Sequence, residues 1–221
     1  MPELQVLRVF VAADGGAGNP LGLFVAAGEA PTAARQATAA RLGYSETVFV
    51  HDRASGALTI HTPLVELPFA GHPLVGTAWA LEELDVLRPP AGQVPVRREG
   101  ACAFIEADPA QTPAWDLIEL EGVGEVRSLD APPNGSGHAC CWAPSSGARG
   151  ELYARVFAPD YGVPEDPATG SAAVALCAAL GRELRIVQGA GSELHARPLP
   201  SGRVELSGRV VLDERRPERI G

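Results

Sequence analysis

The sequence predicts an α+β fold of two similar halves, in each of which a sheet surrounds one apolar helix. The first observation is an internal repeat. A loop followed by an apolar segment occurs at residues 66–84 and again at residues 165–180, and the two units align without gaps at a constant offset of 99 residues. The second observation is that both apolar segments carry apolar or small residues on nearly every face, which indicates helices enclosed by protein.

The two copies of the repeat match on Glu, Pro and Gly. Residues 66–72 are ELPFAGH and residues 165–171 are EDPATGS, so a polar residue, His72 or Ser171, follows glycine where each helix begins. If the halves pack about a pseudo-twofold axis, free N–H groups of two helix N-termini face one cleft, which favours a carboxylate or enolate-like anion. The alternative is that the glycines and prolines only shape turns, and that His72 and Ser171 are ordinary N-caps.

Short β-branched and apolar stretches between Pro/Gly turns predict the strands of both halves. A helix is expected over residues 32–42, with Thr32 as its N-cap and Gly43 as its stop, and a second over residues 74–84. The helix of the second half ends at Gly181. The expected strands are residues 4–12, 21–26, 47–51, 57–62, 94–96, 101–106, 117–120, 138–143, 152–158, 185–188, 193–197, 203–206 and 209–212.

The middle of the chain contains the expected domain boundary. Residues 111–113 (QTP) have the composition of a linker, which predicts domains at residues 1–112 and 113–221. The charged tail after Asp213 is expected to fray.

The composition indicates a globular protein that does not bind nucleic acid. Hydrophobic residues make up 46% of the chain and charged residues 20%, as in ordinary globular proteins. The formal charge is −9 and lysine is absent, so nucleic acid would be repelled. The N-terminus has no signal-peptide pattern, and the most apolar stretch, residues 172–180, is far short of the roughly 20 residues that span a bilayer. We expect no membrane partner and a cytoplasmic location.

The four cysteines are expected to be reduced packing residues. They form no Cys-x-x-Cys pair, and the adjacent Cys140 and Cys141 are poorly placed for a zinc site or a disulfide. The other two are Cys102 and Cys177.

Glu46 is the candidate proton carrier. It lies in residues 44–50 (YSETVFV), where a carboxylate is expected at the sheet edge with little water around it, a setting that suits taking and returning a proton. Considered alone, it is more simply a solvated loop residue. His72 could bind a substrate or relay a proton. Asp166 could accept a hydrogen bond from a substrate amine or orient a neighbouring donor. Its counterpart in the first half is Leu67, so the two halves differ at this position.

Five motifs make the chain similar to a known family. They are AGNPL at residues 17–21, SETVF at 45–49, ELPFAGHP at 66–73, EDPATGSA at 165–172 and QG at 188–189. With these motifs in this order, the chain resembles the PhzF-like phenazine-biosynthesis family, a branch of the diaminopimelate epimerase fold. The third and fourth motifs are long and specific.

The resemblance implies two pseudo-symmetric domains, each a curled, mostly antiparallel sheet wrapped around a central helix, with the C-terminal strand a candidate to complete the first. It also implies a homodimer that uses no metal or organic cofactor. The family's phenazine enzyme isomerises a dihydro-hydroxyanthranilate, and a glutamate moves a proton between ring carbons. Carried onto this sequence, Glu46 is the base, in a site between the domains. The residues that would hold the substrate, expected to bear a carboxylate, are His72, Asp166, Ser171, Gly71 and Gly170.

Alternatives within the same fold stay open. The chain looks shorter than typical relatives between about residues 95 and 150, which leaves the substrate's size and one wall of the cleft undetermined. Epimerases and racemases of this fold use two facing cysteines, and the loops around His72 and Asp166 contain none, which disfavours a two-thiol mechanism. An epimerase or racemase that uses Glu46 and His72 is one alternative. A non-catalytic small-molecule-binding protein is the other.

Overall fold

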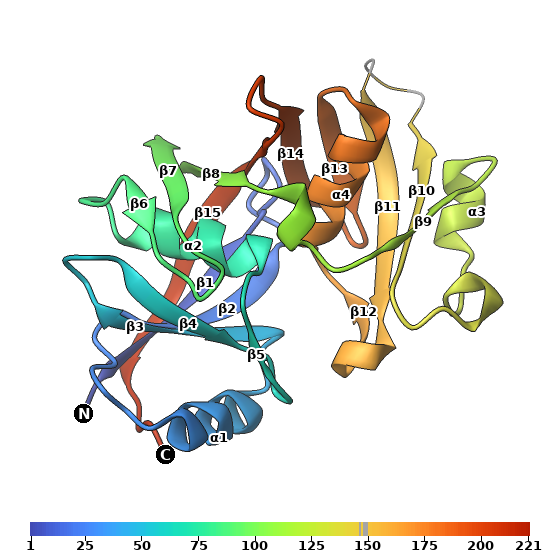
Figure 1. Ribbon diagram of the computed structural model, residues 1–221. Coiled ribbons are helices and arrows are strands. Elements are labelled where there is room, and N and C mark those ends of the chain that lie inside the picture. Colours follow the sequence, from blue (N-terminus) through green and yellow to red (C-terminus); the bar gives the residue numbers. More distant parts are fainter. Residues whose placement is uncertain (146, 148–149) are drawn as a thin grey trace.

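The structure is a computed structural model that describes residues 1–145, 147 and 150–221. Figure 1 shows two lobes, each built around one helix: α2 (Gly71–Ala80) in the first lobe and α4 (Gly170–Leu180) in the second. Both helices are buried along most of their length, as their apolar and small side chains predict. Their first residues are 99 positions apart in the chain, so the repeat in the sequence is a repeat in the structure, and the predicted α+β fold is confirmed.

The strands of the described residues form one curled, mostly antiparallel sheet around the two helices. Its main path runs β5-β4-β3-β2-β1-β15-β14-β13-β11-β10-β9, and the parallel pairs along it are β2 with β3, β9 with β10 and β11 with β13. The strands of the first lobe are β1 (Glu3–Val9), β2 (Asn19–Phe24), β3 (Glu46–Asp52), β4 (Ala57–His61), β5 (Glu66–Leu67), β6 (Val86–Leu87), β7 (Val94–Glu99) and β8 (Cys102–Ala107). Those of the second are β9 (Asp116–Glu119), β10 (Ala139–Pro144), β11 (Glu151–Ala158), β12 (Val163–Asp166), β13 (Leu184–Gln188) and β14 (Ser192–Pro198).

The last strand, β15 (Val204–Pro217), belongs to both lobes. Its first part pairs with β14 and β8, and its second part pairs antiparallel with β1 as far as Glu3 opposite Pro217. In Figure 1 it is the long red strand that runs from one lobe into the other. The expectation that the tail frays after Asp213 is therefore wrong, because β1 offers this segment a full row of backbone partners. The strands expected at residues 203–206 and 209–212 are parts of this one strand.

Smaller helices lie outside the central pair, and the first of them corrects one prediction. Pro31 is the N-cap of α1 (Thr32–Leu42), and the Thr32 hydroxyl accepts a hydrogen bond from Arg35 instead of capping the helix. Gly43 ends α1 in the left-handed conformation at φ 70°, as predicted. The others are α3 (Val123–Arg127) and three 3₁₀ turns, η1 (Pro109–Gln111), η2 (Pro133–Gly135) and η3 (Pro159–Tyr161).

Helix α2 begins and ends earlier than the predicted 74–84. Pro73 sits in its first turn, where a missing N–H costs no intrahelical bond. The guanidinium of Arg98 donates to the carbonyls of Ala78, Leu81 and Leu84. The carbonyl oxygens at the end of the helix therefore have a side-chain donor instead of the N–H groups of further helical turns.

The four cysteines are free thiols, as expected. Burial raises the pKa of Cys140 to about 12 and those of Cys141 and Cys177 to about 11, so these three are protonated packing residues. Cys102 is half-buried. Within the described residues, none of the helices is both long and apolar enough to cross a membrane.

Candidate active site

The N-termini of α2 and α4 meet at the junction of the two lobes. A Cβ atom added to Gly71 would lie 2.8 Å from the Cα of Gly170, and one added to Gly170 would lie 2.8 Å from the backbone nitrogen of His72. Among the described residues no side chain caps either helix, whose N-caps are Ala70 and Thr169. The prediction of two facing helix N-termini is confirmed. The alternative in which His72 and Ser171 are the caps is wrong, since each is the second residue of its helix.

Glu46 and His72 form a close ion pair beside these helix starts. Glu46 is the first residue of β3, and its Oε2 lies 3.0 Å from Nδ1 of His72. The glutamate side chain is 16% exposed and the histidine 3%. Burial by itself lowers the pKa of His72, but the nearby charges of Glu46 and Asp166 outweigh it, so the pKa is raised above its ordinary value. The contact with His72 Nδ1 holds Oε2 of Glu46 and leaves Oε1 for other contacts.

Asp166 approaches the same junction from the second lobe. It is the last residue of β12 and is buried, and it accepts hydrogen bonds from Asn19 Nδ2 at 2.8 Å, Thr169 Oγ1 at 2.6 Å and Ser45 Oγ at 3.3 Å. Burial and the charge of Glu46 raise its pKa to about 6, against the opposing effects of His72 and of the hydrogen-bond donors. The carboxyl group therefore changes charge near neutral pH.

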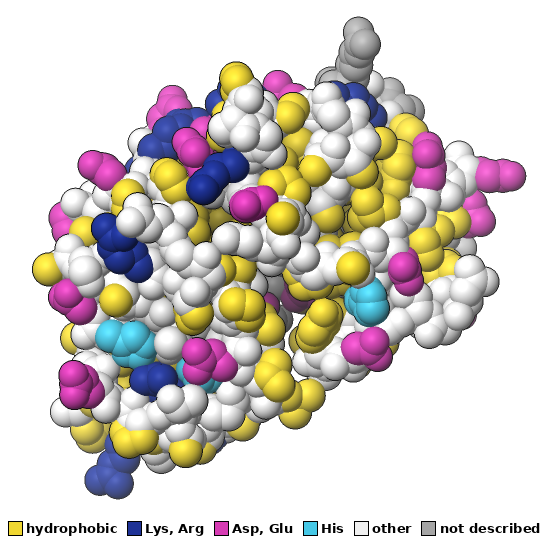
Figure 2. All heavy atoms as spheres, in the orientation of Figure 1, with side chains coloured by type: hydrophobic (Ala, Val, Ile, Leu, Met, Phe, Trp, Pro, Cys, Tyr) yellow, Lys and Arg dark blue, Asp and Glu magenta, His cyan; other side chains and the backbone are white. Residues whose placement is uncertain are grey.

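A cleft opens between the lobes over these groups. Figure 2 shows the molecule hollowed near its centre, with hydrophobic side chains around the hollow. The cleft is lined by Ser45, Glu46, Thr62, Leu67, Phe69, Ala70, Pro113, Trp115, Ala158, Tyr161, Val163, Asp166, Thr169 and Ser171. The lining has two carboxylates and no arginine. An anionic group in the cleft would therefore be bound by backbone N–H groups and hydroxyls.

The predicted site residues come together, but in different positions relative to the cleft. Glu46, Asp166 and Ser171 line it. His72 lies behind Glu46, and Gly71 and Gly170 form the contact between the helix starts.

Several residues at the site were not singled out from the sequence. Trp115 donates from Nε1 to the Oγ of Ser171 at 3.2 Å and lines the cleft, as Tyr161 does. Ser45 and Asn19 lie in quoted motifs, but nothing local to them shows that they meet Asp166, since those contacts join segments more than 100 residues apart.

The comparison with known proteins places this chain in a family. The family model described as phenazine biosynthesis-like protein, PhzC-PhzF, matches residues 8–115 and 135–210. The chain belongs to the PhzC-PhzF family. The match covers β2 to β8 and β10 to β14, and with them every residue of the Glu46, His72 and Asp166 cluster.

Relatives of known activity are isomerases, and this chain is an isomerase of the PhzC-PhzF family. It is 32% identical to the trans-2,3-dihydro-3-hydroxyanthranilate isomerase of Pseudomonas aeruginosa over 80% of this chain and 79% of that protein. The structure superposes on a phenazine biosynthesis PhzC/PhzF protein from Clostridium difficile with a TM-score of 0.80, at 21% identity and full coverage of both chains. A hydroxyproline epimerase from Agrobacterium vitis shares the fold at 11% identity, with a TM-score of 0.64 over 97% of this chain and 91% of that chain.

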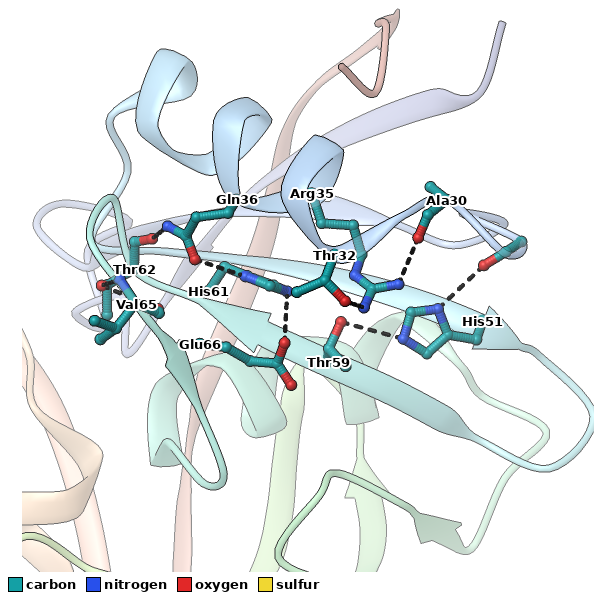
Figure 3. Close-up of polar contacts among 11 residues, drawn as sticks. Ala30, Thr32, Arg35, Gln36, His51, Thr59, His61, Thr62, Val65 and Glu66 are labelled. Carbon is teal, nitrogen blue, oxygen red and sulfur yellow. Dashed lines mark hydrogen bonds and ion pairs between the residues drawn. The ribbon is translucent and has the colours of Figure 1, made fainter.

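A second cluster of titratable groups of this PhzC-PhzF protein lies under α1, and these groups, His61 and Glu66, are not among the residues that line the cleft (Figure 3). His61 is fully buried, with Nδ1 3.0 Å from Gln36 Oε1 and Nε2 3.6 Å from Glu66 Oε2. Gln36 Nε2 donates to the Thr62 carbonyl at 2.8 Å, which fixes the amide so that its oxygen faces His61. Burial lowers the pKa of His61, so we interpret this cluster as a neutral, structural histidine.

No group of three or more His, Cys, Asp or Glu side chains in the described part of the chain is arranged to hold a metal ion. The polar groups at the cleft are carboxylates, an imidazole, hydroxyls and the helix N-termini.

Proposed function

We propose that the protein isomerises a small carboxylate-bearing metabolite by moving a proton between two carbon atoms, with Glu46 as the group that takes and returns it. The observation that carries the proposal is the placement of Glu46: a shielded carboxylate, held at one oxygen by His72, in a cleft beside two helix N-termini. A cofactor is not needed for this chemistry.

The helix N-termini supply the site for the substrate carboxylate. Both α2 and α4 start at glycines without side-chain caps, and the N–H groups there favour an anion. Ser171 adds a hydroxyl at the same place. Because Trp115 already donates to the Ser171 oxygen, the Ser171 hydroxyl hydrogen is free to point at the substrate. The same N–H groups would stabilise the negative charge that develops when a proton leaves carbon.

The proton transfer uses the free oxygen of Glu46. Oε1 takes the proton from an acidic C–H, the electron pair moves into the conjugated system of the substrate, and the protonated Glu46 returns the proton to a second carbon. His72, whose Nδ1 lies 3.0 Å from Oε2, keeps the carboxylate oriented throughout. Asp166 faces the substrate from the other lobe as an acceptor for an amine or hydroxyl. Atoms and charges balance without a co-reactant.

The first substrate to test is trans-2,3-dihydro-3-hydroxyanthranilate, after which the relatives at about 30% identity are named. The proposal expects an ultraviolet absorbance change as the double bonds shift. In D₂O it expects deuterium at the carbon that receives the proton, because the protonated carboxyl of Glu46 exchanges with solvent before it returns the proton. If this compound is inert, a thermal-shift screen of small cyclic carboxylates identifies ligands, since a ligand that binds the native state raises the melting temperature.

An amino-acid epimerase or racemase of the same fold is the second candidate, favoured by the structural likeness to a hydroxyproline epimerase. None of the lining residues is a cysteine, so such an activity would also depend on Glu46 and His72. Exchange of the α-hydrogen of an amino acid with D₂O, without an absorbance change, would favour this candidate over the isomerase. Binding with neither signal would favour a non-catalytic protein.

A further inference from the structure

Asn19 joins the two lobes at the candidate active site. It is the first residue of β2 and is fully buried, yet its side chain contacts the second lobe. Nδ2 donates to Asp166 Oδ1 at 2.8 Å and to the carbonyl of Ala168 at 3.0 Å. Asp166 ends β12 and Ala168 lies in the loop that leads into α4, so one amide group of the first lobe holds this segment of the second.

The contacts of Asn19 fix the orientation of its amide. A carboxylate and a carbonyl can only accept, so the nitrogen of the amide must face them and the oxygen must face the other way. That oxygen accepts from Ser45 Oγ at 3.2 Å. Ser45 precedes Glu46 in the chain, and Asn19 therefore lies between the strand that carries Glu46 and the loop that carries Asp166.

The second oxygen of Asp166 is held in the same way. Thr169 Oγ1 donates to it at 2.6 Å, while Thr169 itself accepts from Gln188 Nε2 at 3.0 Å. The carboxyl group is thus met by donors at both oxygens, an arrangement that favours its ionised form. The charged groups that face it are Glu46, which opposes ionisation, and His72, which favours it.

The loop before Asn19 is itself tied to the second lobe. The backbone N–H of Glu193 donates to the carbonyl of Phe10 at 2.9 Å, and that of Gly18 donates to Ser192 Oγ at 3.0 Å. Phe10 is fully buried and has a φ of 64°, a conformation that is strained for a bulky residue and persists only where its surroundings hold it. The hydrogen bonds of this loop fix the position of Asn19 at the junction of the two lobes.

We propose that Asn19 is a positioning residue that holds the Asp166 carboxylate in its ionised, hydrogen-bond-accepting state across the junction of the two lobes. The proposal rests on the proposed function only in that Asp166 is taken to bind the substrate. The second lobe would then present a charged acceptor to a substrate amine or hydroxyl only while the first lobe is docked against it, which links the assembly of the cleft to its chemistry.

The test is a ¹³C NMR titration of protein labelled at the aspartate carboxyl carbons, with the Asp166 signal assigned by its loss in Asp166→Asn. In the natural protein we expect Asp166 to titrate near pH 6, since burial and the charge of Glu46 raise its pKa to about 6. Asn19→Ala removes a donor to a charged group and should raise this midpoint by about one pH unit. Asn19→Asp has nearly the same shape, adds a like charge, and should raise it further. Gln36→Ala, which removes an amide side chain bonded only within the first lobe, should leave it unchanged.

This titration needs no substrate, so a failed turnover assay leaves it valid. Where turnover is measured, the acid limb of the kcat/KM profile should move to higher pH together with the Asp166 midpoint. Thermal unfolding shows whether Asn19→Ala is folded. If it is not, the Asp166 midpoint in Asn19→Asp tests the proposal. An unchanged Asp166 midpoint in folded Asn19→Asp, or an equal shift in Gln36→Ala, overturns the proposal.

Discussion

At the scale of single residues, the two carboxylates of the cleft are suited to different roles because they have different neighbours. Glu46 is paired with a histidine whose pKa is raised, whereas Asp166 accepts from neutral donors, and burial and the charge of Glu46 raise its own pKa to about 6. Groups with different neighbours can serve different roles in one site. Glu46 is placed to move a proton, and Asp166 is placed to hold a polar group of the substrate.

The raised pKa of Asp166 predicts a pH dependence of stability. The folded protein keeps a proton on Asp166 up to about pH 6, whereas the unfolded chain releases it near pH 3.8. The free energy of unfolding should therefore fall as pH rises through this window, by on the order of 2–3 kcal/mol. Asp166→Asn should flatten that fall in urea titrations between pH 4 and 7. The exposed Asp130→Asn is the matched control and should keep it. An equally steep fall in Asp166→Asn would contradict the assignment.

Chemistry-bearing residues were predictable from the sequence where a motif marked them. Glu46, His72 and Asp166 stand in such motifs, and the structure brings them together. Trp115 and the contact between Asn19 and Asp166 were not predictable, because each depends on how two distant segments pack. No local pattern of side chains contains that information.

At the scale of elements, the site depends on the contact between the starts of α2 and α4. A methyl group on Gly71 would meet backbone atoms of Gly170, which cannot move aside as a flexible side chain could. We expect Gly71→Ala to lower the free energy of unfolding by about 2 kcal/mol or more through overpacking. Gly124→Ala, in α3 with open space around the position, should change it by less than about 1 kcal/mol. Urea denaturation compares the two, and equal effects would show that the contact is not tight.

Element ends were predictable where glycine determined them. Gly43 and Gly181 both adopt the left-handed conformation just after their helices, as the sequence indicates. The start of α2 was predicted three residues late, because Pro73 resembles a boundary but is accommodated in the first turn. The short strand β12 was not predicted, because it lies in a Pro/Gly-rich stretch that reads as a loop. It is a strand because it pairs with β11.

At the scale of the whole molecule, β15 couples the two lobes through one continuous strand. The repeat predicted the two lobes. The C-terminal end of β15 was not predicted, because the residues after Asp213 are mostly charged. Residues 214–217 pair with β1, and the Glu218 carboxylate contacts Arg41 on α1. The domain boundary near residue 112 stays a prediction.

Removal of residues 214–221 should therefore destabilise the first lobe. It exposes the edge of β1 and uncovers Leu4 and Val6, so we expect the free energy of unfolding to fall by at least about 2 kcal/mol and aggregation to increase. Arg215→Ala, an exposed change in the same segment, should alter stability by no more than about 0.5 kcal/mol. Thermal unfolding followed by circular dichroism measures both. A truncated protein as stable as the full chain would contradict the role given to β15.

The central claim is that Glu46 carries the proton, and the most direct measurement compares Glu46→Gln with Glu66→Gln in D₂O on the substrate identified for the natural protein. Glu46→Gln keeps the shape of the side chain and removes the base, whereas Glu66 lies outside the cleft lining and contacts His61. We predict that Glu46→Gln slows both turnover and deuterium incorporation by a factor on the order of 10² or more with binding retained, and that Glu66→Gln leaves both within a few-fold of the natural rate. Normal turnover and labelling by Glu46→Gln would show that another group moves the proton.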